Sequence, residues 1–351
     1  ELLTLSDVLE VSGEAGDFTA KIRRRARYVS LENCIGCGAC FEPCPVTAAN
    51  EFEEGLSERK AIHVACAGAL PNAPVIDMEH CLRGKDKDCQ LCKDACMFDA
   101  IRYEDEDGEM TVNVGAIIVA TGYRLGDVRQ FPEYGYGKIP NVYSAFEFER
   151  LRASNGPTSG TIQTRDGQKP QSIGMIHCVG RDEKKYCSQV CCMYLTKFAH
   201  YAFDCLENVR VFQFFKEHSI PGKGNQKLFE EVKAKGVDMI RAKALSISAN
   251  GDHSGVRIEY EDEKAEKKAV EVDMAVLAPF MEPYPGTDEL AQLLGIQLDD
   301  FGFIKTADYD SVSTTRSGIF AIGCVQSPKF MNDTTIQAHI AAGHVLSLTG
   351  E

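Results

Sequence analysis

The chain has 351 residues, enough for about two domains with their own hydrophobic cores. Its formal net charge of -14 argues against a nucleic-acid binder, because such a protein needs a basic face to displace counterions from phosphates. No stretch approaches the roughly 20 apolar residues needed to cross a bilayer, so no membrane span is predicted.

Residues 3–30 alternate polar and apolar side chains around a turn at 13–16, which predicts a β-hairpin. From 31 to about 103 the composition shifts to Cys, Gly and Pro with little periodicity, as expected where metal clusters replace a hydrophobic core. We interpret this segment as a small inserted domain. The run 111–123 then predicts a buried strand, and the pattern after it is typical of alternating α/β structure.

The rest of the chain indicates a βαβ unit followed by further strands and a last helix. Strands are expected at 172–180, 208–215, 237–248, 255–262, 267–279 and 318–325. Helices are expected at 226–236 and 334–348.

Fifteen cysteines are typical of either a disulfide framework or metal ligation, and spacing decides between the two. Here several cysteines follow one another at short, regular intervals, which favours ligation. No secretory signal opens the sequence, so a reducing, cytoplasmic location is expected, where thiolates stay available.

The first cysteine group has the spacing C-x2-C-x2-C-x3-C-P, by which bacterial ferredoxins hold a [4Fe–4S] cluster. It consists of Cys34, Cys37, Cys40 and Cys44. A zinc site is the alternative, but zinc sites usually pair two C-x2-C steps, and three consecutive steps favour iron. Small residues between these cysteines let backbone amides approach cluster sulfurs.

A second group has a widened first spacing, C-x7-C-x2-C-x3-C, and Met97 in the place of the usual Pro. It consists of Cys81, Cys89, Cys92 and Cys96. In two-cluster ferredoxins the fourth cysteine of each run binds the cluster of the other run. That resemblance pairs Cys96 with the first three cysteines of the first group, and Cys44 with the first three of the second.

The spacing of the third group, C-x8-C-x3-C-C, matches no common zinc or ferredoxin pattern. It consists of Cys178, Cys187, Cys191 and Cys192. From spacing alone a cluster and a redox-active thiol or disulfide group are equally expected, because adjacent cysteines also occur as buried structural residues. The isolated Cys66 and Cys205 are expected to be small buried hydrophobes.

Two Gly-terminated segments, 115–123 and 318–326, resemble the strands that flank flavin in thioredoxin reductase-like flavoproteins. They predict flavin contacts at Ala120, Thr121 and Gly122, and at Gly323 and Cys324. In that class the second strand usually ends in Gly-Asp, so Gly323-Cys324 is a departure.

Taken in order, the motifs resemble the A subunit of heterodisulfide reductase, a flavin and iron–sulfur protein, over nearly the whole chain. The matching segments are CIGCGACFEPCPV (34–46), AIIVATGY (116–123), EYGYGKIPNVYSAFEFERL (133–151), HCVG and YCSQVCCMY (177–194), and AIGCVQSPK (321–329). Members of that family keep Gly-Cys in place of Gly-Asp. In that family the third cysteine group holds a non-ferredoxin [4Fe–4S] cluster, which carries over to Cys178, Cys187, Cys191 and Cys192.

The fold that the resemblance implies is α/β, a two-lobed thioredoxin reductase-like flavoprotein frame with an inserted 2[4Fe–4S] ferredoxin-type domain. Its boundaries would be 1–30 and 106–150 for parts of the FAD domain, 31–105 for the ferredoxin-like insert, 151–280 for a nucleotide-domain-like lobe carrying the third cysteine group, and 281–351 for the C-terminal part of the FAD domain.

The resemblance also implies catalytic residues beside the flavin ring. Lys197 matches the family lysine whose charge would stabilise reduced flavin and help to deliver a proton. Glu147 is expected to be a second proton-handling residue, with Glu149 as its rival. The segment with Gln337 and Ala338 is expected to open the last helix, so that its amides face the flavin.

One departure from the family concerns the flavin itself. The Gly-rich turn G-x-G-x-x-G, which seats the pyrophosphate, is not found in these 351 residues. Three explanations are open: another polypeptide supplies the Gly-rich turn, the encoded chain is longer than this sequence, or the protein has lost flavin.

The leading hypothesis is an electron-transfer subunit of an anaerobic heterodisulfide reductase-like complex that splits or joins electron pairs at FAD. Its end substrate would belong to methanogenesis or lie on a partner, as in complexes that reduce aromatic acyl thioesters or serve sulfate respiration. Its expected partners are other subunits of that complex, ferredoxin, and a chain that supplies the missing flavin-binding segment. The alternative is a flavin-free [4Fe–4S] relay in another anaerobic complex, such as one that reduces aromatic acyl-CoA thioesters. A structural protein stabilised by disulfides or zinc is the least expected interpretation, since paired cluster motifs have no purpose there.

Overall fold

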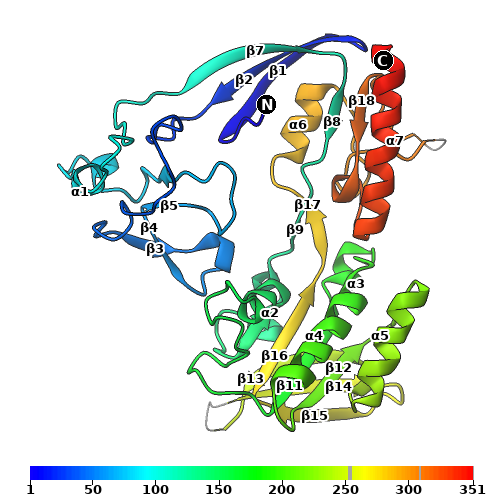
Figure 1. Ribbon diagram of the computed structural model, residues 1–351. Helices are drawn as coiled ribbons and strands as arrows, with labels where there is room; N and C mark the ends of the chain where they lie inside the picture. Colours follow the sequence, from blue (N-terminus) through cyan, green and yellow to red (C-terminus); the bar gives the residue numbers. More distant parts are fainter. Residues whose placement is uncertain (252–254, 308–309, 351) are drawn as a thin grey trace. The chain divides into compact units, whose positions relative to one another are not determined.

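The computed structural model describes residues 1–251, 255–307 and 310–350, and its contacts divide the chain into two units (Figure 1). Unit 1 comprises Glu1–Gly13 and Asp17–Val114, and unit 2 comprises Glu14–Gly16 and Gly115–Glu351. The finer domain boundaries expected from the sequence stay a prediction.

Unit 1 contains a three-stranded sheet with the order β1 (Ser6–Glu14), β2 (Asp17–Arg24) and β7 (Gly108–Val114). Strands β2 and β7 are antiparallel, with Phe18 opposite Val114. The hairpin predicted for residues 3–30 is therefore confirmed, and the strand that follows the cysteine-rich segment pairs with it.

Between β2 and β7 the cysteine-rich segment forms only short elements. They are β3 (Thr47–Ala49), η1 (Glu51–Glu53), β4 (Glu58–Lys60), β5 (Ile62–His63), β6 (Val75–Ile76), η2 (Arg83–Lys85) and α1 (Leu91–Asp94). Cysteine and aromatic side chains such as Cys92 and Tyr103 pack against its small core, which consists of Val29, Cys40, Ile62, Ile76, Ala100 and Ile101. Little periodicity in the sequence thus corresponds to little regular structure.

Unit 2 is built on a seven-stranded sheet. Its order is β10 (Val142–Ser144), β16 (Met274–Pro279), β11 (Ser172–Val179), β12 (Arg210–Phe215), β13 (Asp238–Ala249), β14 (Val256–Asp262) and β15 (Lys267–Val272). Pairing is parallel from β10 to β13 and antiparallel from β13 to β15. Every residue of β16 is buried, as expected for a parallel strand covered on both faces, whereas β14 alternates.

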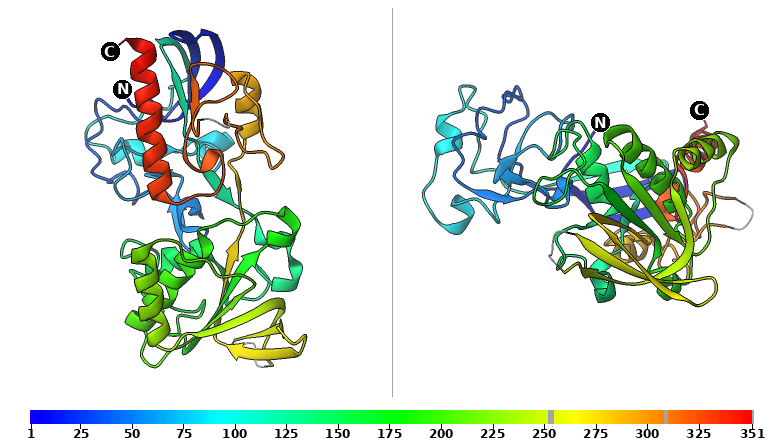
Figure 2. Two further views of the ribbon diagram at one scale, coloured as in Figure 1. Left: turned by 90° about the vertical axis from the view of Figure 1, so that its right-hand side faces the viewer. Right: turned by 90° about the horizontal axis from the view of Figure 1, so that it is seen from below.

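Helices α2 (Ala145–Arg152) and α4 (Cys191–Cys205) pack beside this sheet, and α5 (Lys223–Ala234) packs against α4. Figures 1 and 2 show α4 and α5 together on one face of it. The α/β class and the βαβ unit predicted from the sequence are confirmed.

The segment 267–279, predicted as one stretch of strand, forms two strands at separate positions in the sheet. The break is at Asp273, whose carboxylate accepts hydrogen bonds from the backbone of Gln171 and Ser172. These bonds anchor the start of β16 beside β11, while β15 stays at the antiparallel edge.

The remaining elements of unit 2 include two small sheets. Strand β8 (Ile117–Val119) pairs in parallel with β18 (Ile319–Ala321), and β9 (Tyr123–Leu125) pairs antiparallel with β17 (Met281–Pro283). The other elements are η3 (Val128–Gln130), η4 (Pro132–Tyr134), α3 (Arg181–Lys184), α6 (Thr287–Leu294), η5 (Gly323–Val325) and α7 (Met331–Thr349).

Helix α7 begins at Met331, three residues before the predicted start at 334. The hydroxyls of Thr334 and Thr335 donate to the carbonyls four residues earlier, as threonines inside a helix do, so they do not cap its start. Gln337 and Ala338 therefore lie in the second turn and do not open the helix. In the described ranges, no helix has the length and apolar character needed to cross a membrane.

Candidate functional site

The loop of the first cysteine group depends on two glycines in the left-handed conformation, Gly36 with φ 71° and Gly38 with φ 77°. A Cβ on Gly36 would lie 2.4 Å from Nδ2 of Asn72, so only glycine fits there. Burial, followed by the nearby thiols of Cys92, Cys34 and Cys37, raises the pKa of Cys40 to about 12. Three cysteines of the first group are thus neighbours in the folded chain.

Three cysteines of the second group and one cysteine of the first group line the same small apolar pocket. Cys44, Cys81, Cys89 and Cys92 all line this pocket. This is the crossed set that the ferredoxin pattern implies. The fourth cysteine of the second run, Cys96, packs with Cys34 against the core of unit 1 and accepts a hydrogen bond from the backbone of Ala100 at 3.3 Å. That the eight cysteines of these two groups bind clusters remains a prediction, and their arrangement is consistent with it.

Tyr103 is a neighbour of the second group that the sequence analysis missed. Its hydroxyl lies 3.1 Å from Sγ of Cys92, and the guanidinium carbon of Arg83 lies 4.3 Å from the centre of its ring. Burial, then the contact with Cys92, raises the pKa of the Tyr103 hydroxyl, so that it stays protonated. No motif marks this residue, because it is 11 residues from Cys92 in sequence.

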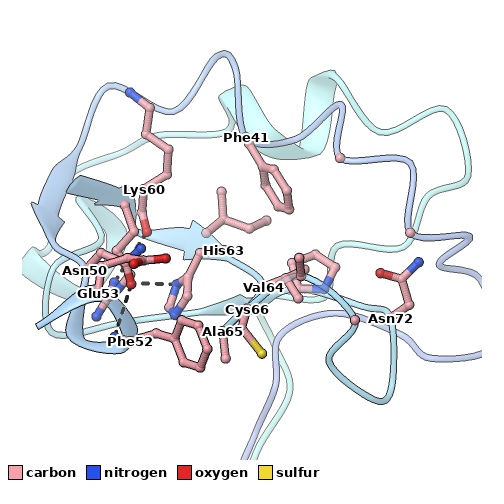
Figure 3. Close-up of a pocket in the computed structure, with 17 residues that line it drawn as sticks. Phe41, Asn50, Phe52, Glu53, Lys60, His63, Val64, Ala65, Cys66 and Asn72 are labelled. Carbon is pink, nitrogen blue, oxygen red and sulfur yellow. Dashed lines mark hydrogen bonds between the residues drawn. The ribbon is translucent and has the colours of Figure 1, made fainter. Parts of the chain in front are cut away.

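A pocket of about 440 Å³ lies beside the loop of the first group. Gly36 and Gly38 line it on one side, and Figure 3 shows the side chains of His63, Cys66 and Asn72 around it. Cys66, like Cys205, is only half-buried, which corrects the expectation of two small buried hydrophobes.

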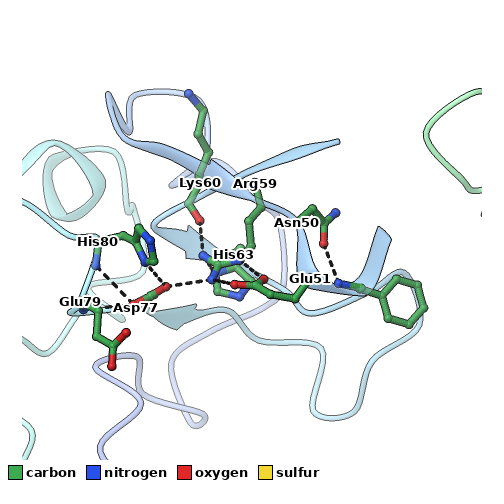
Figure 4. A network of polar contacts seen from close by, with 9 residues as sticks. Asn50, Glu51, Arg59, Lys60, His63, Asp77, Glu79 and His80 are labelled. Atoms are coloured by element: carbon green, nitrogen blue, oxygen red, sulfur yellow. Dashed lines mark hydrogen bonds and ion pairs between the residues drawn. The ribbon is translucent and has the colours of Figure 1, made fainter. Parts of the chain in front are cut away.

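Next to this pocket, Arg59 forms the centre of a polar network (Figure 4). Its guanidinium, only 10% exposed as a side chain, pairs with Glu51 at 2.5 Å and Asp77 at 2.8 Å. Asp77 also accepts from the backbone of His80 and lies 2.8 Å from its ring. Because the backbone amide of Cys81 donates to the carbonyl of Asp77, the network fixes the start of the second cysteine group.

The third group gathers around the N-terminus of α4. Cys178 is near the end of β11 with φ 59°, and Cys191 and Cys192 are the first two residues of α4, each 4% exposed. A hydrogen bond between these two thiols raises the pKa of Cys191 and lowers that of Cys192, and Cys178 and Cys187 are also neighbours of Cys191. The fold thus brings all four cysteines together.

The hydroxyl of Tyr194 and Nε2 of His218, both buried beside the third group, lack a hydrogen-bond partner among the described residues. Leaving such a group unsatisfied costs about 1–3 kcal/mol. The ring of His218 lies 5.7 Å from that of His177, which is next to Cys178 in sequence. A bound group with sulfur acceptors fits these surroundings, since it would give these atoms partners.

Within the described ranges, no group of three or more His, Cys, Asp or Glu side chains is arranged around the position of a single metal ion. A four-iron cluster requires another arrangement, because each of its four cysteines binds a different iron.

Lys197 pairs with Glu149 and not with Glu147. The Lys197 ammonium lies 2.6 Å from the Glu149 carboxylate, and both side chains are more than one-third exposed. Glu147 is 3% exposed, caps α2 through the backbone of Ser144, and pairs with Arg165 at 2.5 Å. On this geometry the rival Glu149, and not Glu147, is the partner of Lys197.

Only some of the residues expected to contact flavin are free of contacts that would compete with it. Ala120 and Thr121 are exposed, and a Cβ on Gly122, which has φ 77°, would meet open space. The backbone amide of Gly323 instead donates to the side chain of Gln337 at 2.8 Å, and Sγ of Cys324 lies 3.7 Å from the carbonyl of Lys329. The first of the two segments therefore fits a flavin contact, whereas Gly323 and Gln337 already bind each other.

Comparison with protein families matches residues 27–49 to the 4Fe-4S binding domain. This range holds the first cysteine group. The match covers the loop that contains Gly36 and Gly38.

Curated relatives match nearly the whole chain. It is 36% identical to the A subunit of the H(2):CoB-CoM heterodisulfide,ferredoxin reductase of Methanothermobacter thermautotrophicus, over 97% of this chain and 52% of that protein. It is also 36% identical to the iron-sulfur A subunit of the CoB--CoM heterodisulfide reductase of Methanocaldococcus jannaschii, over 98% of this chain and 53% of that protein. The chain thus spans about half the length of the relatives that it matches.

Among solved structures, thioredoxin reductase of T. acidophilum superposes with a TM-score of 0.46 at 16% identity, over 83% of this chain and 86% of that chain. LpdA of Mycobacterium tuberculosis superposes with a TM-score of 0.47 at 17% identity, over 71% of this chain and 46% of that one.

Proposed function

We propose that this chain, a homologue of the A subunits of heterodisulfide reductases over 97% of its own length, is an iron–sulfur electron-transfer subunit of an anaerobic oxidoreductase complex. The observation that carries the proposal is the convergence of cysteines far apart in sequence. Cys44 joins Cys81, Cys89 and Cys92 in one pocket, and Cys178 joins Cys191 and Cys192.

Three four-iron clusters would be held by these groups. Cys34, Cys37, Cys40 and Cys96 would hold the first, Cys81, Cys89, Cys92 and Cys44 the second, and Cys178, Cys187, Cys191 and Cys192 the third. Such clusters supply one-electron transfer when bound. The protein positions their sulfur ligands and, through donors such as Tyr103, sets the electrostatics around them.

FAD is the further cofactor that we propose, at Ala120, Thr121 and Gly122. When bound, it would exchange electrons with the clusters and allow an electron pair to be divided between two acceptors. If Lys197 lies beside flavin, as the family resemblance implies, it would hold a proton for the ring, and Glu149, 2.6 Å away, would exchange that proton with solvent because both side chains are partly exposed.

The proposed partners follow from the names of the relatives, which include ferredoxin and the CoB-CoM heterodisulfide. We propose that the chain works within a heterodisulfide reductase-like complex, exchanges electrons with ferredoxin, and shares its flavin site with a segment that carries the Gly-rich turn.

A second candidate is a flavin-free relay of clusters. The bond between the Gly323 amide and the Gln337 side chain favours it, because that amide is not free for a ligand. Lys329 also donates to Gln337 at 3.1 Å and so strengthens the same arrangement.

The test is to quantify iron, acid-labile sulfide and flavin in the complex purified without oxygen, and to assign them to this chain. We expect about twelve irons per chain, from three four-iron clusters, together with one FAD. About eight or twelve irons without flavin would establish the relay instead. An iron content well below about eight would overturn both candidates, since even two clusters require that number.

A further inference from the structure

The buried hydroxyl of Tyr194 is a group that no role assigned above uses. Tyr194 follows Cys192 by two residues in the first turn of α4. Its hydroxyl oxygen is buried and has no hydrogen-bond partner among the described residues. Because the fold keeps this donor away from water, the structure requires an acceptor that its own side chains do not provide.

The surroundings of Tyr194 show what kind of acceptor belongs there. The groups that act electrostatically on its hydroxyl are Cys191, Tyr123, Cys192 and Cys178. A phenol carries its proton at neutral pH and can therefore donate. Three of the four neighbours belong to the third cysteine group, so the missing acceptor lies where that group converges.

Unit 1 contains the same chemistry with the partner present. There the Tyr103 hydroxyl lies 3.1 Å from Sγ of Cys92, a cysteine of the second group. A tyrosine hydroxyl beside a cysteine group is therefore satisfied in unit 1 and unsatisfied in unit 2. This difference is expected if the acceptor in unit 2 is a sulfur of the bound cluster and not a cysteine side chain.

We propose that Tyr194 donates a hydrogen bond to a sulfur of the four-iron cluster held by Cys178, Cys187, Cys191 and Cys192, and thereby raises the reduction potential of that cluster. The inference rests on the third cluster proposed above. Tyr194 acts as a positioning and tuning residue, since it does not bind iron itself.

The physical reason is the charge that reduction adds. When the cluster takes up one electron its sulfurs become more negative, and a hydrogen bond to them becomes stronger. The donor thus stabilises the reduced state more than the oxidised state. Tyr123, which follows the residues expected to contact flavin, acts electrostatically on Tyr194, and Cys324 acts on Tyr123.

The test uses the Tyr194→Phe variant of the whole complex, with Tyr201→Phe as the matched control. Tyr201 lies on the same helix, seven residues further on, where its ring stacks on Phe198 and on Arg152. Redox titration followed by electron paramagnetic resonance would measure the potential of each cluster. For Tyr194→Phe we expect the ratio of reduced to oxidised third cluster at a fixed potential to fall about tenfold, which is about 59 mV for one electron.

In the same titrations the two ferredoxin-type clusters, and all three clusters of Tyr201→Phe, should keep the potentials of the unchanged protein. An unchanged potential of the third cluster in Tyr194→Phe, with its iron retained, would overturn the role of Tyr194 and leave the proposed function standing. A native complex with only about eight irons per chain would instead overturn the third cluster itself.

If the Tyr194→Phe variant loses iron, a second variant with fluorotyrosine in place of Tyr194 serves as the test. Its ring keeps nearly the same size, while its hydroxyl becomes a stronger hydrogen-bond donor. We expect this substitution to shift the potential of the third cluster upward, opposite to Tyr194→Phe. No shift with iron retained would contradict the hydrogen bond.

Discussion

The two units of this chain hold their cysteine groups in different ways. In unit 1 the groups lie within the core, and Cys40 is itself one of its few buried residues. In unit 2 the seven-stranded sheet has a core of its own, formed by residues such as Phe214, Val256 and Leu277, and none of the four cysteines of the third group is among its described members. We therefore expect unit 1 to depend on the clusters proposed for its cysteines, and unit 2 to fold around ordinary apolar packing.

Removal of iron should produce the largest difference in stability between the two units. With a chelator and a reductant present, we expect unit 1 to lose its fold over residues 31–103 and unit 2 to keep its sheet, because only unit 1 would lose the centre of its core. Hydrogen exchange read by mass spectrometry should show fast exchange in peptides of the cysteine-rich segment and continued protection of β11 and β16. Equal protection in both units would contradict the comparison.

Arg59→Met should have the next largest effect, and only on unit 1. It removes the guanidinium from the half-buried carboxylate of Asp77, which keeps its contacts with His80 but loses a hydrogen bond to a charged group, worth about 1.5–3 kcal/mol. A denaturant titration that is monitored by the absorbance of the clusters should show this loss of stability as a lower denaturant concentration at the midpoint of unfolding. Arg257→Met is the matched control, since Arg257 on β14 is 44% exposed and pairs only at the surface, so a change below about 0.5 kcal/mol is expected. Similar losses in both variants would rule out a special role for Arg59.

Tyr103→Phe should have the smallest effect, a change of potential without a change of fold. The variant removes the hydroxyl that lies 3.1 Å from Sγ of Cys92 and keeps the ring under Arg83. We expect the second cluster to become harder to reduce, by a factor of about ten at a fixed potential, because a charge-assisted hydrogen bond is lost. The first cluster, measured in the same titration, is the internal control. Equal shifts of both clusters would point to a general disturbance of unit 1.

Local patterns in the sequence were sufficient for several of the main elements. The hairpin at β1 and β2, the strands β11 to β13 and helix α5 follow from alternation, helical spacing and glycine positions, which act over a few residues. The break at Asp273 could not be predicted, because the hydrogen bonds that fix it come from Gln171 and Ser172, about a hundred residues away.

The same division applies to the candidate site. The spacing of the cysteines within the first two groups predicted iron–sulfur chemistry, since neighbouring ligands must reach one cluster, whereas the spacing of the third group left a cluster and a redox-active thiol equally expected. The sequence by itself therefore determined the type of chemistry and the loops that carry it. Only the tertiary structure decided that Lys197 meets Glu149 and not Glu147, and that the hydroxyl of Tyr103 lies beside Cys92. Such contacts depend on how helices and loops distant in sequence pack, and residue spacing along the chain does not encode them.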